Sequence, residues 1–127
     1  MTGLRVLLVE DDALNQELVR VILGRSADPV LAGAELAVAG SLAQARAVLA
    51  ADAIDVVLLD LHLPDGSGLD LVAEIWRDGD RASCVVIALS GAKEQYEAAM
   101  AAGCAAVLGK PYRSDELCRQ IVAHLPR

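Results

Sequence analysis

Residues 56–68 of the chain read VVLLDLHLPDGSG, an apolar run that ends in an acid and leads into a glycine-rich turn. The run from Val56 to Leu59 is apolar at every position, which is typical of a parallel strand covered by helices on both faces. Four similar runs recur along the 127 residues, at 4–9, 36–39, 84–89 and 105–108. The chain is therefore predicted to contain five buried strands.

Segments with helical periodicity separate the predicted strands. We expect a first helix around residues 14–22, three more over 42–51, 68–77 and 92–102, and a last helix capped by Ser114. Ser41 and Gln44 have the spacing of a capping box, which places the start of the second helix near residue 42. The apolar face of the first helix is predicted to consist of Leu14, Leu18, Val21 and Ile22.

Strands and helices alternate along the chain. The predicted fold class is therefore α/β of the (βα)₅ type, a doubly wound sandwich with a five-stranded parallel sheet in the order 2-1-3-4-5. The 127 residues suffice for one domain, and no second domain is expected. The stretch from Gly24 to Ala34 contains Pro29 and is long for a connection, so we expect an extended surface loop there.

The composition argues against several classes of function. With a formal net charge of -7, a nucleic-acid-binding surface is not expected, because contacts to phosphates need clustered Lys and Arg. No apolar run approaches the roughly 20 residues of a membrane helix, and the N-terminus lacks the pattern of a signal peptide. The three cysteines are widely spaced, which favours buried thiols in a reducing cytoplasm over disulfides or a zinc site: Cys84, Cys104 and Cys118.

Polar residues mark the carboxyl ends of the predicted strands. They are Glu10 and Asp11 after the first strand, Asp60 at the third, Ser90 at the fourth and Lys110 after the fifth. Ligands bind outside this edge in doubly wound sheets. Two carboxylates about 4 Å apart repel by roughly 4 kcal/mol at an effective dielectric of about 20, so either some of the acids take up protons or a cation neutralises them. Hard oxygen ligands with open water positions suit Mg²⁺. The pattern predicts a phosphoryl-transfer site with Asp60 as the nucleophile.

Four motifs in the same order resemble the receiver domain of two-component response regulators over essentially the whole chain. They are VLLVEDD at 6–12, VVLLDLHLPDGSG at 56–68, IALSG at 87–91 and GKPY at 109–112. The resemblance implies a flavodoxin-like fold and a single receiver domain over residues 1–127. It also implies a phosphorelay function, in which a histidine kinase or histidine phosphotransfer protein supplies the phosphoryl group. The change in partner binding would then reach a downstream output domain or protein.

The resemblance also implies a role for each matching residue. Asp60 would be the phosphoacceptor and a Mg²⁺ ligand. Glu10 and Asp11 would complete the metal site, together with the backbone carbonyl of His62, whose side chain is expected to face solvent. Ser90 would be the switch hydroxyl that turns toward the phosphoryl group.

Lys110 would pair with the phosphoryl group, and its peptide bond to Pro111 is expected to be cis, as is common in the family. Val107 stands where the family often has an aromatic switch residue. Readout is therefore expected to use backbone shifts or Tyr112. Homodimer formation would involve the helix at 92–102, the strand at 105–108 and the last helix.

Other functions fit the sequence less well. The chain is expected to be a cytoplasmic signalling module and no enzyme beyond its own phosphorylation and dephosphorylation. An aspartyl-phosphate hydrolase of haloacid-dehalogenase type would need a DxDxT motif at the first strand and room for a cap. A flavodoxin-like FMN module would have its phosphate repelled by the acids. A degenerate receiver that serves only as a scaffold is a further alternative, against which the intact Asp60, Ser90 and Lys110 argue.

Overall fold

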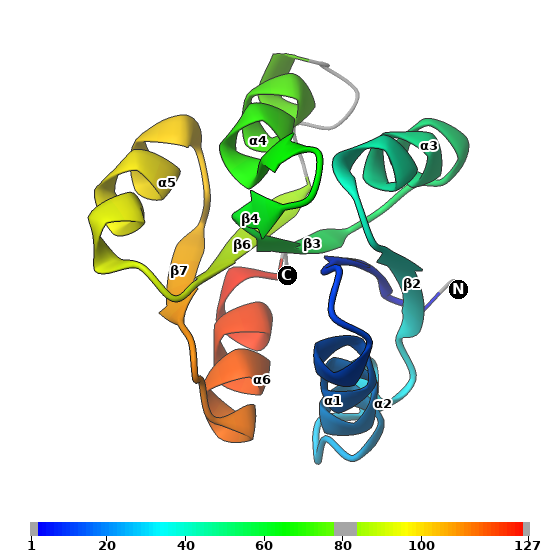
Figure 1. The fold of residues 1–127 in the computed structure, drawn as a ribbon. Helices are drawn as coiled ribbons and strands as arrows, with labels where there is room; N and C mark the ends of the chain where they lie inside the picture. Colours follow the sequence, from blue (N-terminus) through cyan, green and yellow to red (C-terminus); the bar gives the residue numbers. More distant parts are fainter. Residues whose placement is uncertain (1–2, 78–83, 126–127) are drawn as a thin grey trace.

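The computed structural model describes residues 3–77 and 84–125. A parallel sheet in the order β2-β1-β3-β6-β7 forms its centre (Figure 1). Its strands are β1 (Arg5–Val9), β2 (Glu35–Ala39), β3 (Val56–Asp60), β6 (Val85–Ser90) and β7 (Ala106–Gly109). Numbered along the chain, these five strands have the predicted order 2-1-3-4-5, so the doubly wound α/β fold is confirmed.

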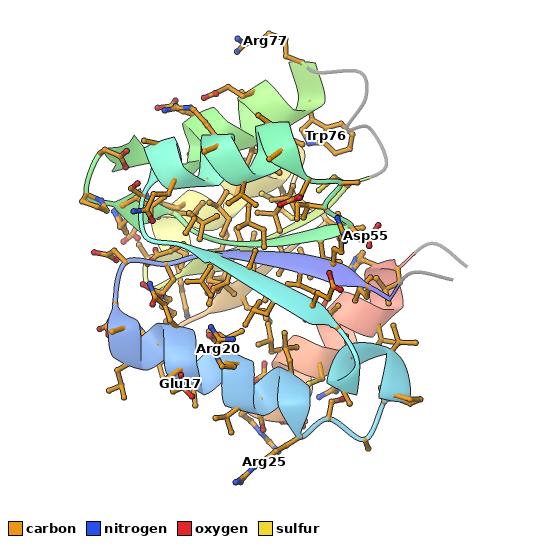
Figure 2. All side chains as sticks on the ribbon, turned by 90° about the vertical axis from the view of Figure 1, so that its right-hand side faces the viewer. Glu17, Arg20, Arg25, Asp55, Trp76 and Arg77 are labelled. Atoms are coloured by element: carbon orange, nitrogen blue, oxygen red, sulfur yellow. The ribbon has the colours of Figure 1, made fainter. Side chains whose placement is uncertain are left out.

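Helices cover both faces of this sheet (Figures 1 and 2). One face carries α3 (Leu42–Ala51), α4 (Gly68–Arg77) and α5 (Tyr96–Ala102), and the other carries α1 (Ala13–Gly24), α2 (Pro29–Ala32) and α6 (Ser114–His124). A short antiparallel pair, β4 (His62–Leu63) and β5 (Gly66–Ser67), lies between β3 and α4 and was not predicted. Within residues 3–77 and 84–125, no helix is long and apolar enough to span a membrane.

The hydrophobic core is divided in two by the sheet. All five residues of β3 are buried, and they alternate between the two halves of the core, Val57 and Leu59 on one side, Val56 and Leu58 on the other. Burial on both sides explains why the strand is apolar at every position before Asp60. Cys84 and Cys104 are buried and Cys118 is half-buried, and burial raises the pKa of Cys104 to about 11.

The predicted apolar face of α1 is correct for Ile22, which packs against the core, and wrong for Leu14, Leu18 and Val21. The side chains that α1 buries are Val19 and Leu23, whereas Leu14 is 79% exposed and Leu18 49% exposed. The helix is apolar on two neighbouring faces, and only one of them can pack on the sheet. The other remains as an exposed stripe of Leu14, Leu18 and Val21, called the α1 stripe below.

The stretch from Gly24 to Ala34 is not an extended loop. It contains the one-turn helix α2, in which Pro29 takes the first position, where its missing N–H costs no hydrogen bond. The Asp28 carboxylate accepts a hydrogen bond from the Val30 amide at 2.9 Å and caps the helix. Leu31 is fully buried against the half of the core under α1. The proline therefore starts a helix here.

The start of α3 agrees with the prediction, whereas the start of α6 and that of the helix expected over 92–102 differ from it. Ser41 caps α3 as expected, accepting a hydrogen bond from the Gln44 amide at 3.2 Å. Ser114, in contrast, is the first residue of α6, and the cap is Arg113, whose backbone N–H donates to Glu116 Oε1 at 3.1 Å. The helix expected over 92–102 begins as a 3₁₀ turn, η2 (Lys93–Gln95), before α5.

Candidate functional site

The register of the sheet brings the predicted acids to one edge. β1 and β3 pair in parallel with Val9 opposite Leu59, so the next residues along the two strands, Glu10 and Asp60, lie side by side. Single carboxylate oxygens of Glu10, Asp11 and Asp60 lie within 4.8 Å of one another. Glu10 is 2% and Asp60 is 7% exposed, whereas Asp11 is open to solvent.

This donor set fits a hard divalent cation. Three carboxylates supply oxygen ligands only, and the exposed Asp11 leaves one side of the cluster open to water. Mg²⁺ prefers such a partial protein shell that keeps several waters over a complete cage. The backbone N–H of His62 donates to Asp60 Oδ1 at 2.9 Å, while the imidazole side chain is exposed as predicted. The His62 imidazole therefore faces solvent, while the His62 backbone holds the Asp60 carboxylate.

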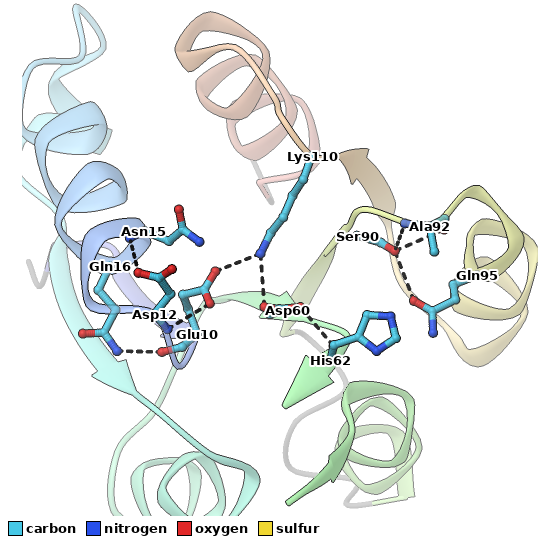
Figure 3. A network of polar contacts seen from close by, with 10 residues as sticks. All are labelled: Glu10, Asp12, Asn15, Gln16, Asp60, His62, Ser90, Ala92, Gln95 and Lys110. Atoms are coloured by element: carbon cyan, nitrogen blue, oxygen red, sulfur yellow. Dashed lines mark hydrogen bonds and ion pairs between the residues drawn. The ribbon is translucent and has the colours of Figure 1, made fainter. Parts of the chain in front are cut away.

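Lys110 joins the two buried acids (Figure 3). Its Nζ lies 2.9 Å from Glu10 Oε1 and 3.1 Å from Asp60 Oδ2. Burial opposes the charge of this ammonium, but the hydrogen bonds that it donates to both carboxylates and the attraction of their charges together outweigh that effect, and the pKa of Lys110 is raised. The Lys110–Pro111 peptide bond is cis, as predicted. The sheet order thus assembles one cation and two anions from strands far apart in sequence.

Several residues that the sequence analysis missed hold these groups in place. Gln16 in α1 donates from Nε2 to the Glu10 carbonyl at 2.6 Å. The loop after β3 is tied to α3, because Asp65 accepts hydrogen bonds from the Leu42 and Ala43 amides at 2.8 and 3.1 Å. These hydrogen bonds lower the pKa of Asp65. No motif spacing signals either contact, since each partner comes from a different segment of the chain.

Gly68 allows α4 to start directly against the backbone of Asp60. A Cβ at this position would lie 2.7 Å from the Asp60 carbonyl oxygen and 3.1 Å from the Leu59 side chain. The Gly68 amide in addition donates to the Leu61 carbonyl at 3.0 Å. Glycine at position 68 of the glycine-rich turn is therefore a packing requirement beside Asp60.

Ser90 is fully buried at the end of β6 and is held by the loop that follows it. Its Oγ accepts a hydrogen bond from the Ala92 amide at 3.1 Å, and the hydroxyl faces two acceptors, Ala92 O at 3.2 Å and Gln95 Oε1 at 3.1 Å. Figure 3 shows the hydroxyl directed toward Ala92 and Gln95, while Asp60 is bonded to Lys110 and His62. Sequence spacing did not indicate Gln95.

Val107, at the usual switch position, and Tyr112, which was considered for readout, lie on different faces of the sheet. Val107 is half-buried in β7 and packs against the half of the core under α3 to α5. Tyr112 is partly buried near α1 and α6, where burial raises the pKa of its hydroxyl. It lines a groove of about 660 Å³ together with Leu18 and Cys118.

Comparison with known proteins defines the class. The family described as the response regulator receiver domain matches residues 6–122, and the chain belongs to this family. It is 37% identical over 125 residues to the sensor histidine kinase AruS of Pseudomonas aeruginosa, covering 95% of this chain and 12% of that protein. It is 32% identical over 123 residues to the response regulator protein PilR of the same organism, covering 97% of this chain and 26% of that protein.

Solved structures agree with this fold. The chemotaxis response regulator CheY4 of Vibrio cholerae superimposes with a TM-score of 0.86 at 22% identity, covering 98% of this chain and all (100%) of that chain. The chain spans only a small part, 12% and 26%, of the two curated relatives named above. In both relatives the matching region is therefore part of a longer protein.

Proposed function

We propose that this receiver domain accepts a phosphoryl group on Asp60 from the phosphohistidine of a histidine kinase or histidine phosphotransfer protein. One observation carries the proposal. Asp60 is 7% exposed, is paired with Lys110 at 3.1 Å, and shares a cluster of oxygens with Glu10 and Asp11. Family membership over residues 6–122 supports the same role.

The transfer breaks the N–P bond of the donor's phosphohistidine and forms an O–P bond to the Asp60 carboxylate. The donor imidazole keeps the electron pair and takes up a proton from solvent, so the only group that moves between the proteins is the phosphoryl group. Lys110 already faces the Asp60 carboxylate and follows the added negative charge, which it neutralises in part. The chain's contribution is positioning and charge compensation.

Glu10, Asp11 and Asp60 would hold Mg²⁺, with the backbone carbonyl of His62 as a further proposed ligand. When bound, Mg²⁺ would withdraw negative charge from the phosphoryl oxygens and shield them from the carboxylates. Glu10 is kept in place by the Gln16 contact to its carbonyl and accepts a hydrogen bond from the Asp12 amide at 3.2 Å. These contacts preorganise the acid pair for a cation.

The α1 stripe supplies a docking surface for the donor protein. α1 begins at Ala13, directly after the acids, so its exposed apolar residues start at the edge of the phosphorylation site. A protein that delivers its phosphohistidine to Asp60 has to rest against this edge. Leu14 at 79% and Leu18 at 49% exposure offer apolar contact there.

The output follows from the same site. Ser90 and Lys110 turn toward the phosphoryl group, and the surface formed by α5, β7 and α6 changes its affinity for an output domain or protein, or for a second copy of the chain. The module acts in the cytoplasm, does not contact nucleic acid itself, and performs no chemistry beyond its own phosphorylation and dephosphorylation. The net charge of -7 is consistent with a protein partner.

The test is phosphorylation by acetyl phosphate, followed by intact-protein mass spectrometry. We expect one phosphoryl group on the chain in the presence of Mg²⁺ and none in EDTA. Asp60→Asn should abolish labelling, and Asp70→Asn, at an exposed acid in α4, should leave it unchanged. Labelling of Asp60→Asn at the unaltered rate would rule out the assignment. Labelling of the wild-type chain also excludes a scaffold that has lost its chemistry.

A further inference from the structure

The Ser90 hydroxyl is held away from Asp60 by a side chain that follows it five positions later. Ser90 is 0% exposed, and its single hydrogen is shared between Gln95 Oε1 at 3.1 Å and Ala92 O at 3.2 Å. Both acceptors lie in the loop between β6 and α5. Because Ser90 is buried, turning its hydroxyl toward Asp60 costs these two contacts, which a phosphoryl oxygen on Asp60 can replace.

The position of Gln95 gives this contact a second consequence. Gln95 is the last residue of η2 and the residue before α5. Its half-buried side chain therefore links the buried hydroxyl to the start of α5 (Figure 3). This contact places the Ser90 hydroxyl one residue away from the first turn of α5.

The next residue extends the link to β7. The Tyr96 hydroxyl lies over Gly109, so closely that a Cβ at position 109 would overlap with it. Gly109 ends β7 and precedes Lys110. Gln95 and Tyr96 thus bridge from Ser90 to the strand end that carries the lysine, and they do so without an aromatic side chain at Val107.

We propose that Gln95 is a positioning residue that holds the Ser90 hydroxyl away from Asp60 in the unphosphorylated protein, and that Tyr96 carries its release to β7. This proposal rests on the proposed function. Gln95 stabilises the inactive arrangement and so sets how readily the site accepts a phosphoryl group. In this proposal the aromatic residue that reports the switch is Tyr96, whereas the sequence led us to expect backbone shifts or Tyr112.

The test compares Gln95→Met, which keeps the length of the side chain but removes the acceptor oxygen, with the wild-type chain. The rate of phosphorylation by acetyl phosphate with Mg²⁺ should rise about 2- to 5-fold, the factor for one neutral hydrogen bond with an alternative acceptor. Glu94→Gln, at the exposed neighbouring position in η2, is the control and should leave the rate unchanged. Equal rates for Gln95→Met and the wild-type chain would overturn the proposal.

A double-mutant cycle separates positioning from a general packing effect. In a Ser90→Ala background there is no hydroxyl to hold, so Gln95→Met should leave the remaining phosphorylation rate unaltered. The same rise in both backgrounds would overturn the proposed role of Gln95. The Tyr96 step is measured by the amide resonance of Gly109, which should shift on addition of beryllofluoride in the wild-type chain and shift less in Tyr96→Leu.

The outcomes distinguish the proposed role of Gln95 from the proposed phosphoacceptor function of Asp60. A wild-type chain that takes no phosphoryl group overturns both. If the wild-type chain is labelled and Gln95→Met is labelled at the same rate, only the proposed role of Gln95 is overturned. Circular dichroism of the variants confirms that each is folded before its rate is compared.

Discussion

Replacing Lys110 by Met should destabilise the protein and make its stability depend strongly on Mg²⁺. Lys110 Nζ lies 2.9 Å from Glu10 Oε1 and 3.1 Å from Asp60 Oδ2. At these separations each contact has a Coulomb energy of roughly 5 kcal/mol at an effective dielectric of about 20, and desolvation of the three charges offsets much of it. Without the lysine, two buried carboxylates face each other with no compensating charge.

The net cost of breaking a buried ion pair is roughly 3–5 kcal/mol. The Lys110 side chain is 26% exposed to solvent. Because solvent screens it in part, we expect the smaller value of about 2–3 kcal/mol for Lys110→Met. At roughly 3–4 °C per kcal/mol for a domain of this size, the unfolding temperature should fall by about 6–12 °C.

The assay is thermal unfolding at pH 7, followed by circular dichroism or by the fluorescence of Trp76, in EDTA and in excess Mg²⁺. Mg²⁺ restores a positive charge to the same carboxylates, so its stabilising effect should be larger in Lys110→Met than in the wild-type chain. Lys93→Met, at an exposed lysine in η2, is the matched control and should behave as the wild-type chain does.

Two results would refute this reasoning. The first is a Lys110→Met protein that melts at the wild-type temperature in EDTA, which would mean that the two carboxylates are not destabilised by losing the lysine. The second is a Mg²⁺ effect of equal size in both proteins. That result would mean that the cation does not bind to the carboxylates that Lys110 contacts.

Three further predictions concern other parts of the molecule. Leu18→Glu in the α1 stripe should slow phosphotransfer from a phosphorylated histidine donor protein at least about 10-fold, the effect of losing one apolar contact at an interface, while labelling by acetyl phosphate stays at the wild-type rate; equal slowing of both reactions would contradict docking at α1. Gly68→Ala should lower the free energy of unfolding by about 1–3 kcal/mol through overpacking against the Asp60 backbone, measured by urea denaturation, whereas Gly24→Ala, where a Cβ meets nothing within 4 Å, should be neutral or stabilising. The lowered pKa of Asp65 means that its stabilising effect is complete above the ordinary value of 3.8 and is lost as the pH falls through the lower folded-state value, so Asp65→Asn should melt below the wild-type chain at neutral pH and approach it in acid.

Much of the fold was predictable because parallel strands in a doubly wound sheet are buried on both faces. Val56 to Leu59 had to be apolar at every position, and that pattern identifies the strand without any tertiary information. Right-handed crossovers limit the possible strand orders, and 2-1-3-4-5 is a common order among doubly wound sheets. Once the order is known, Glu10 and Asp60 necessarily meet at one edge, which is why the sequence was enough to predict the acid cluster.

Helix orientation was less predictable for a physical reason. The residues of α1 offer two apolar faces, and periodicity cannot tell which one the sheet will cover. The structure buries Val19 and Leu23 and leaves Leu14 exposed. In the same way, Pro29 indicates a break in regular structure but not whether it ends one helix or starts another; the Asp28 cap and the buried Leu31 decided for a short helix.

The sequence by itself therefore determined the class of fold, the edge at which the polar groups gather, and the identity of the charged residues there. Only the tertiary structure decided how those groups are held. Three hydrogen bonds join separate segments or cross a loop: Gln16 to the Glu10 carbonyl, Asp65 to the start of α3, and Gln95 to Ser90. Packing decides which partner each of these side chains meets. A buried strand can be recognised from its own sequence, because its residues are apolar. These hydrogen bonds, in contrast, depend on how different segments are placed relative to one another, and the sequence of one segment does not determine that placement.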